Sequence, residues 1–160
     1  MNNTWHFVIY VAVCLILYFG LRFYYLHSNK KTLPIPSDIV FYLLQFTWGL
    51  TLNLCGWAIG LALILSKKRP KKYRQVWCFE LPIDFGLSLG TVILCPEDNE
   101  EVRQHEYGHS IQNVYLGSFM IWVVCIPSVI RFWWRKLKPH RIKTAYNDIW
   151  FEGQASLNGK

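Results

Sequence analysis

Apolar blocks at residues 5–26 and 39–65 dominate the first part of the chain. The first block has no charged residue before Arg22, and the second has none. A helix rises about 1.5 Å per residue, so about 20 apolar residues cross the hydrocarbon core of a bilayer. A cleaved signal peptide is the alternative for the first block, but the opening "MNNT" lacks the basic region of such a peptide. The pattern predicts two transmembrane helices.

Polar side chains interrupt the second block at Gln45, Thr47, Thr51 and Asn53. At membrane depth, such side chains face a neighbouring helix more often than lipid. We therefore expect hydrogen bonds between helices, and a substrate-facing role for Asn53 is the alternative. The Pro-Ile-Pro sequence at 34–36 should break the chain before this block, with Ser37 or Asp38 as helix cap.

The pattern changes to alternation from Phe85 onwards. One face collects Phe85, Leu87, Leu89, Thr91 and Ile93, and the other begins with Gly86, Ser88 and Gly90. A period of two predicts a strand, and small residues leave its backbone open to a close neighbour. The strand belongs either to a small hairpin or to a sheet edge that pairs with an extended peptide.

A polar helix should follow this strand. Pro96 ends the strand, and Asp98 with Glu101 has the spacing of a capping box. We expect the helix over residues 99–115, at the membrane surface, because it is too polar to lie in lipid. The next apolar stretch, 116–130, contains Pro127 and is too short to cross a bilayer, so it predicts a re-entrant or membrane-embedded helical segment.

Composition and charge agree with a membrane protein. The 160 residues are 52% hydrophobic and 17% aromatic, with a net charge of +7. Clusters of six Lys and Arg at 67–74 and again at 131–143 predict the cytoplasmic side of a multi-pass cell-membrane protein. Because both clusters adjoin apolar segments, we expect a lipid bilayer with anionic lipid headgroups as the partner, and no nucleic acid.

The helix at 99–115 carries the sequence "HEYGH", which has the spacing H-E-x-x-H. Residues four apart share a helix face, so His105 and His109 can direct their imidazoles to one metal ion. Glu106 between them can serve as a general base. An amphipathic helix with an incidental pair of histidines is the alternative.

A catalytic zinc site needs a third protein ligand. The downstream candidates are Glu152, Asp148 and His140. We favour Glu152, a carboxylate among aromatic residues near the end of the sequence. Ala155, one helical turn later, is small enough for its helix to approach the helix of the histidines closely.

Motifs in residues 85–159 resemble a known family. The segments "FGLSLG", "HEYGHSIQ", "LGSFMI", "IPS" and "WFEGQASLNG" are similar to those of zincin metallopeptidases of the gluzincin type, and more narrowly to small bacterial membrane proteins with a zinc-protease core. The resemblance implies Zn²⁺ held by His105, His109 and Glu152, with Glu106 as catalytic base. Ser156 stands where many such chains have an acidic residue that supports a ligand histidine.

The predicted fold is mainly α-helical and integral to the membrane. Residues 1–66 form a transmembrane helical hairpin. Residues 67–160 form a membrane-associated zincin-like core: a short strand or hairpin, a metal-binding helix, a membrane-embedded helical segment and a C-terminal ligand helix. Of the five cysteines, the three in apolar runs (Cys14, Cys55 and Cys125) are expected to be small buried hydrophobic residues. Cys78 and Cys95 should be free thiols and are not expected to bind zinc.

The predicted function is a membrane-bound zinc-dependent peptidase that cleaves a peptide or membrane-protein substrate at the cytoplasmic membrane surface. Tyr107, Tyr115 and Tyr146 are candidate donors to the oxyanion. One alternative is a zinc-binding membrane module with a regulatory or interaction role and no turnover. Another is a membrane adaptor that binds lipid or nucleic acid, in which the histidine pair is incidental.

Overall fold

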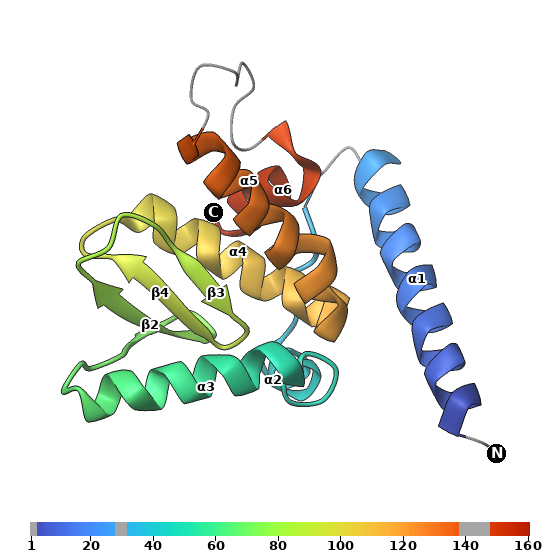
Figure 1. Ribbon diagram of the computed structural model, residues 1–160, viewed down its shortest axis with the longest axis horizontal. Coiled ribbons are helices and arrows are strands. Elements are labelled where there is room, and N and C mark those ends of the chain that lie inside the picture. Colours follow the sequence, from blue (N-terminus) through green and yellow to red (C-terminus); the bar gives the residue numbers. More distant parts are fainter. Residues whose placement is uncertain (1–2, 28–31, 138–147) are drawn as a thin grey trace.

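The computed structural model describes residues 3–27, 32–137 and 148–160 (Figure 1). The helices are α1 (Asn3–His27), α2 (Asp38–Phe46), α3 (Leu50–Leu65), α4 (Glu100–Leu116), α5 (Ile126–Leu137) and α6 (Trp150–Asn158). The strands are β1 (Lys71–Tyr73), β2 (Val76–Leu81), β3 (Leu87–Leu89) and β4 (Val92–Pro96). The sheet has the order β1-β2-β4-β3, in which only β2 and β4 are parallel.

The sheet lies between α3 and α4. Alternate residues of β2 and β4 point to opposite faces. On one face, Cys78 and Ile93 belong to a buried cluster with Tyr107 and Ile111 of α4. On the other face, Phe79 and the neighbouring apolar residues of β4 pack with the side of α3 that carries Leu63. The sheet therefore supports the metal-binding helix predicted from the sequence, and β3 forms the edge of the sheet.

The prediction of two transmembrane helices is wrong. Among the described residues, no helix by itself has the length and hydropathy of a membrane span, and in α1 a shorter apolar segment is found at Trp5–Leu17. Two helix pairs reach that length and composition only when taken together across sharp bends. These are Asp38–Phe46 with Leu50–Leu65, bent by 91°, and Glu100–Phe119 with Ile121–Leu137, bent by 114°.

Hydrogen bonding explains why residues 39–65 do not form one helix. Oε1 of Gln45 accepts hydrogen bonds from Nδ2 of Asn53 at 2.7 Å and from Nδ2 of Asn113 at 2.6 Å. Oδ1 of Asn53 accepts from the backbone N–H and the hydroxyl of Thr91, both at 2.7 Å. The bend at residues 47–49 turns the polar groups of this block toward α4 and the β3–β4 turn. The expectation of hydrogen bonds between helices is confirmed for Gln45, which bonds Asn113 of α4. Asn53 has a structural role, but it bonds the β3–β4 turn as well as Gln45.

The alternating pattern from Phe85 marks a hairpin rather than one continuous strand. The chain turns at Gly90, whose φ of 70° suits glycine, and β3 pairs antiparallel with β4. Pro96 ends β4 as expected. The hairpin interpretation is therefore confirmed, and β3 is also an edge strand.

The helix predicted over 99–115 is α4, Glu100–Leu116. Its N-cap is Asn99, whose side chain accepts a hydrogen bond from the backbone N–H of Val102. Asp98, the predicted cap, instead has a left-handed backbone with φ of 53°. The chain after α4 forms a 3₁₀ turn (Gly117–Phe119) and a π-helical turn (Ile121–Cys125) before α5 begins. His140 and Tyr146 lie outside the described residues.

Candidate metal centre

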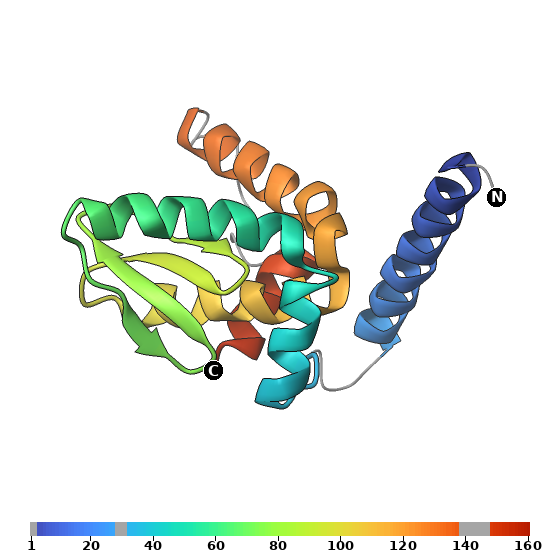
Figure 2. The ribbon, with the colours of Figure 1, turned by 90° about the horizontal axis from the view of Figure 1, so that it is seen from below.

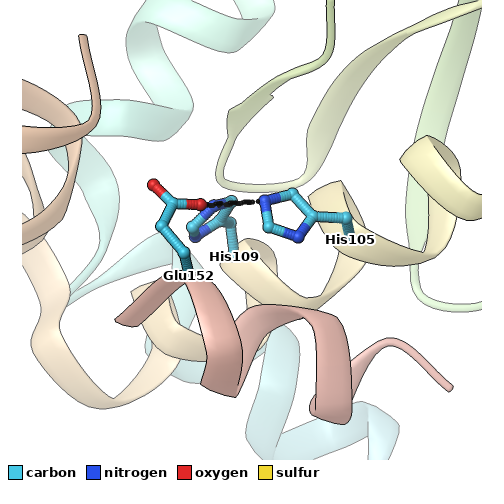
Figure 3. Close-up of side chains that lie close together, drawn as sticks. All are labelled: His105, His109 and Glu152. Atoms are coloured by element: carbon cyan, nitrogen blue, oxygen red, sulfur yellow. Dashed lines mark hydrogen bonds and ion pairs between the residues drawn. The ribbon is translucent and has the colours of Figure 1, made fainter. Parts of the chain in front are cut away.

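Helix α4 places two imidazoles side by side. His105 and His109 are one turn apart, and their Nε2 atoms lie 3.1 Å from each other (Figure 3). Each imidazole presents Nε2 to the same point and uses Nδ1 for another contact. The four-residue spacing of the two histidines therefore places both imidazoles on one face of the helix, as expected.

Helix α6 brings Glu152 to this point. The two helices pack so closely that a Cβ atom on Gly108 would lie 1.9 Å from the carbonyl oxygen of Ala155. A Cβ atom on Gly159 would lie 1.8 Å from the carbonyl oxygen of Gln104. The predicted close approach at Ala155 is confirmed, and it requires glycine on the opposing helix as well.

The three side chains form a compact donor set. Oε2 of Glu152 lies 3.0 Å from Nε2 of His105 and 3.3 Å from Nε2 of His109. Tetrahedral bonds of about 2.0–2.1 Å to zinc would place the donor atoms about 3.3 Å apart, so the set fits such an ion. His105, His109 and Glu152 could thus hold a metal ion. Asp148 does not belong to this group, and His140 lies outside the part of the chain that the structure describes.

Neighbouring side chains fix the orientation of both imidazoles. Nδ1 of His105 lies 2.8 Å from Oγ of Ser156, and Nδ1 of His109 lies 2.8 Å from Oε1 of Gln112. Such contacts to Nδ1 hold the proton there and leave the lone pair of Nε2 for a metal. Ser156 thus contacts one of the two predicted ligand histidines.

The amide of Gln112 can have only one orientation. Its Nε2 donates to the carbonyl oxygen of Phe151 at 2.7 Å and to Oε1 of Gln154 at 3.0 Å. Oε1 must then face His109 and accept the proton of its Nδ1. Sequence analysis missed Gln112, although its position three residues after His109 places it beside that imidazole on a helix.

Glu152 is fully buried and held as a carboxylate. Burial by itself would raise its pKa, but the contacts of Oε2 with Nε2 of His105 and of His109, together with the hydrogen bond from Ser128, reverse this effect and hold the pKa well below the usual range of a glutamate. Ser128 of α5 donates to Oε1, so Oε2 is the oxygen that faces the histidines. Sequence analysis also missed Ser128, because its contact with Glu152 joins residues of separate helices.

Glu106 lies beside the donor set without belonging to it. Burial raises the pKa of this carboxyl to about 8; the charge of His105 lowers it and the charge of Glu152 raises it. A Cβ atom on Gly86, just before β3, would lie 2.3 Å from Oε1 of Glu106. The backbone that precedes the edge strand therefore limits where this carboxyl can lie.

A cavity of about 780 Å³ opens over these residues. Its polar side contains His105, Glu106 and Glu152, and its apolar side includes Phe132 and Trp133 of α5. Residues 84–88, which lead into β3, form a further part of the lining. The volume is in the range of small-molecule and peptide sites.

The predicted oxyanion donors do not line this cavity. The hydroxyl of Tyr107 donates to Oε1 of Gln75, and the hydroxyl of Tyr115 donates to the carbonyl oxygen of Pro34. Tyr146 lies outside the described residues. The two described phenols thus have structural partners away from the donor set.

Cys78 and Cys95 are free, as predicted, and Cys55 and Cys125 are free as well. Cys55 is exposed, so the expectation that it is buried is wrong. Cys78 and Cys95 are buried in the core between the sheet and α4 and do not belong to the metal-binding cluster.

No protein-family model matches this chain, and no curated protein or solved structure is significantly similar to it. The resemblance to gluzincin-type zincins therefore rests on its motif residues alone.

Proposed function

We propose that this chain is a zinc-dependent peptidase of the zincin type. The main support is the convergence of Nε2 of His105, Nε2 of His109 and Oε2 of Glu152 within 3.0–3.3 Å of one another. Two imidazoles and one carboxylate are a donor set that catalytic zinc sites use. Glu106 and the cavity lie directly beside this set.

A zinc ion bound there would supply a polarised water with a pKa of about 7 and a Lewis acid for the substrate carbonyl. Glu106 would accept a proton from the attacking water and later donate it to the leaving amine. Ser156 and Gln112 would hold the two imidazoles in the tautomer that leaves Nε2 free. The contact with Ser128 would keep Oε2 of Glu152 directed at the metal.

The edge strand supports an extended peptide as the substrate. In the described sheet, β4 is the only strand that pairs with β3, so the backbone of β3 has a second edge without a strand partner. Gly86, Leu87 and Ser88 also line the cavity. A peptide added at this edge would pass the donor set and Glu106 in an extended conformation.

A zinc-binding module without turnover is the competing function. A metal site with a purely structural role needs no buried carboxyl beside its ligands, whereas Glu106 is buried and is not part of the donor set. This position favours catalysis over a regulatory role.

Metal content and cleavage test the two functions separately. The purified chain should bind about one zinc ion, and His109→Ala should lose it. Glu106→Gln should keep the zinc and the fold but reduce cleavage of a peptide library, followed by mass spectrometry, by at least about 10²-fold. Equal zinc in wild type and His109→Ala rules out the site. Zinc binding with equal cleavage by wild type and Glu106→Gln rules out Glu106 as the base.

A further inference from the structure

Helix α5 exposes an apolar face. Within Ile126–Leu137, apolar side chains recur at intervals of three and four residues, which places them on one side of the helix. They are Ile126, Val129, Ile130, Trp133 and Leu137, and all are exposed, with 62% for Ile130 and 74% for Leu137. The charged Arg131 and Arg135 are more buried than these residues. The helix is thus inverted relative to an ordinary surface helix, whose apolar side faces the core.

Helix α3 exposes a second apolar face. No charged residue occurs between Leu50 and Leu65, and the buried positions are limited to Leu52, Asn53, Gly56 and Gly60. The exposed side chains include Leu54, Trp57, Leu61, Ile64 and Leu65. Lys67, Lys68 and Arg69 follow directly, and all three are exposed. A basic group therefore stands at the end of an exposed apolar helix.

The two helices lie on the same side of the molecule. In Figure 2, α3 and α5 run along the upper side, and α4 and α6 lie below them. A partner that approaches this side of the molecule would therefore meet both helices.

We propose that the exposed faces of α3 and α5 attach the protein to the surface of an anionic lipid bilayer, with both helices lying in the interface. Exposed apolar helix faces of this extent mark an interaction site, and the adjacent lysine and arginine side chains select a negatively charged partner. A bilayer with anionic headgroups combines the two properties, and the net charge of +7 adds to the attraction. This attachment needs no helix to cross the membrane.

The exposed apolar face of α5 adjoins the cavity. Val129 and Trp133 belong both to the exposed face of α5 and to the lining of the cavity. A consequence for the substrate follows, and it rests on the proposed peptidase function. A peptidase attached in this way would receive in its cavity peptide segments that are held at a lipid surface. The attachment itself does not depend on the metal site.

Co-sedimentation of the full-length chain with lipid vesicles tests the attachment. The chain should bind vesicles of phosphatidylcholine mixed with phosphatidylglycerol more tightly than vesicles of phosphatidylcholine alone, and salt should reduce the difference. The double variant Ile130→Gln/Leu137→Gln should weaken the binding by about tenfold or more, because two apolar side chains that would enter the lipid are lost. Leu157→Gln, an exposed apolar position on α6, is the matched control and should bind like wild type.

Site-specific photocrosslinking identifies what contacts α5. Benzoylphenylalanine in place of Ile130 should transfer a labelled lipid to the chain, whereas the same group in place of Leu157 should not. Crosslinking of position 130 to a second copy of the chain shows that the face binds protein and overturns the proposal. Equal vesicle binding by wild type and the double variant also overturns it. Zinc content provides an independent readout, so a failure of the lipid proposal and a failure of the metal site can be told apart.

Discussion

Oε1 of Gln112 accepts a hydrogen bond from Nδ1 of His109 at 2.8 Å. The other end of the same amide donates to the carbonyl oxygen of Phe151, in the helix that carries Glu152. One side chain therefore orients a ligand histidine and joins α4 to α6.

Replacing Gln112 by Met should weaken zinc binding. Methionine has a similar length but cannot accept the proton of Nδ1, so His109 loses its fixed tautomer. Loss of such a partner costs about 10–100-fold in metal affinity. Competition with a chromophoric chelator measures the change. Gln104→Met on the same helix is the control, because the amide of Gln104 donates only to Glu100. Equal affinity in wild type and Gln112→Met would contradict the assignment.

Replacing Gly86 by Ala should separate catalysis from metal binding. The added Cβ atom would lie 2.3 Å from Oε1 and 2.6 Å from Cγ of Glu106, so this side chain has to shift, whereas no backbone atom is among its three nearest neighbours. The fold and the zinc should therefore be retained while the proposed base is displaced. We expect cleavage to fall by about 10²-fold or more, as for Glu106→Gln. Zinc content and thermal unfolding serve as controls, and unchanged cleavage shows that the position of Glu106 does not matter.

Replacing Gly108 by Ala should prevent α6 from docking. A Cβ atom 1.9 Å from the carbonyl oxygen of Ala155 meets backbone, which cannot move as a side-chain end can. We expect a loss of about 3 kcal/mol or more in the free energy of unfolding, measured with denaturant. Gly20→Ala is a matched control, since nothing lies within 4 Å of its Cβ position in α1. There the substitution should be neutral or slightly stabilising.

Replacing Asn53 by Leu should destabilise the fold without touching the metal site. The backbone N–H and hydroxyl of Thr91 lose their buried acceptor, and Oε1 of Gln45 loses a donor. Buried groups left without partners cost about 1–3 kcal/mol each. Denaturant unfolding should show a loss of that order, and Thr51→Val, at an exposed hydroxyl pair with Ser118, should cost less. An Asn53→Leu protein as stable as wild type argues against this role.

The residues of the candidate metal site could be predicted because their signal is local or depends on residue type. His105 and His109 share a helix face by their spacing alone. Glu152 stood out as a carboxylate among aromatic residues, and the small Ala155 indicated a close helix contact. Gln112 could have been found from its spacing of three residues from His109, whereas the contact of Ser128 depends on which helices meet, and residue spacing does not determine that.

There is a physical reason why the bend in the second apolar block, residues 39–65, could not be predicted. A run without charge suits a membrane helix and an exposed apolar helix packed on a sheet equally well. The bend depends on Asn113 and Thr91, which lie 68 and 38 residues from Gln45 and Asn53, respectively. The cytoplasmic orientation from the two basic clusters stays a prediction, and residues 138–143 of the second cluster lie outside the described residues.

The separation of the ligands along the chain sets the order in which the site can assemble. Glu152 follows His105 by 47 residues, and Asn158 of the same helix accepts a hydrogen bond from the backbone N–H of Leu33, 125 residues earlier. During synthesis, α4 emerges from the ribosome before α6 exists. A nascent chain therefore carries the histidine pair without its carboxylate, and the three-residue set appears only when α6 docks against parts that are already folded. The candidate metal site would thus lack its third ligand until residue 152 has been synthesised and α6 has docked.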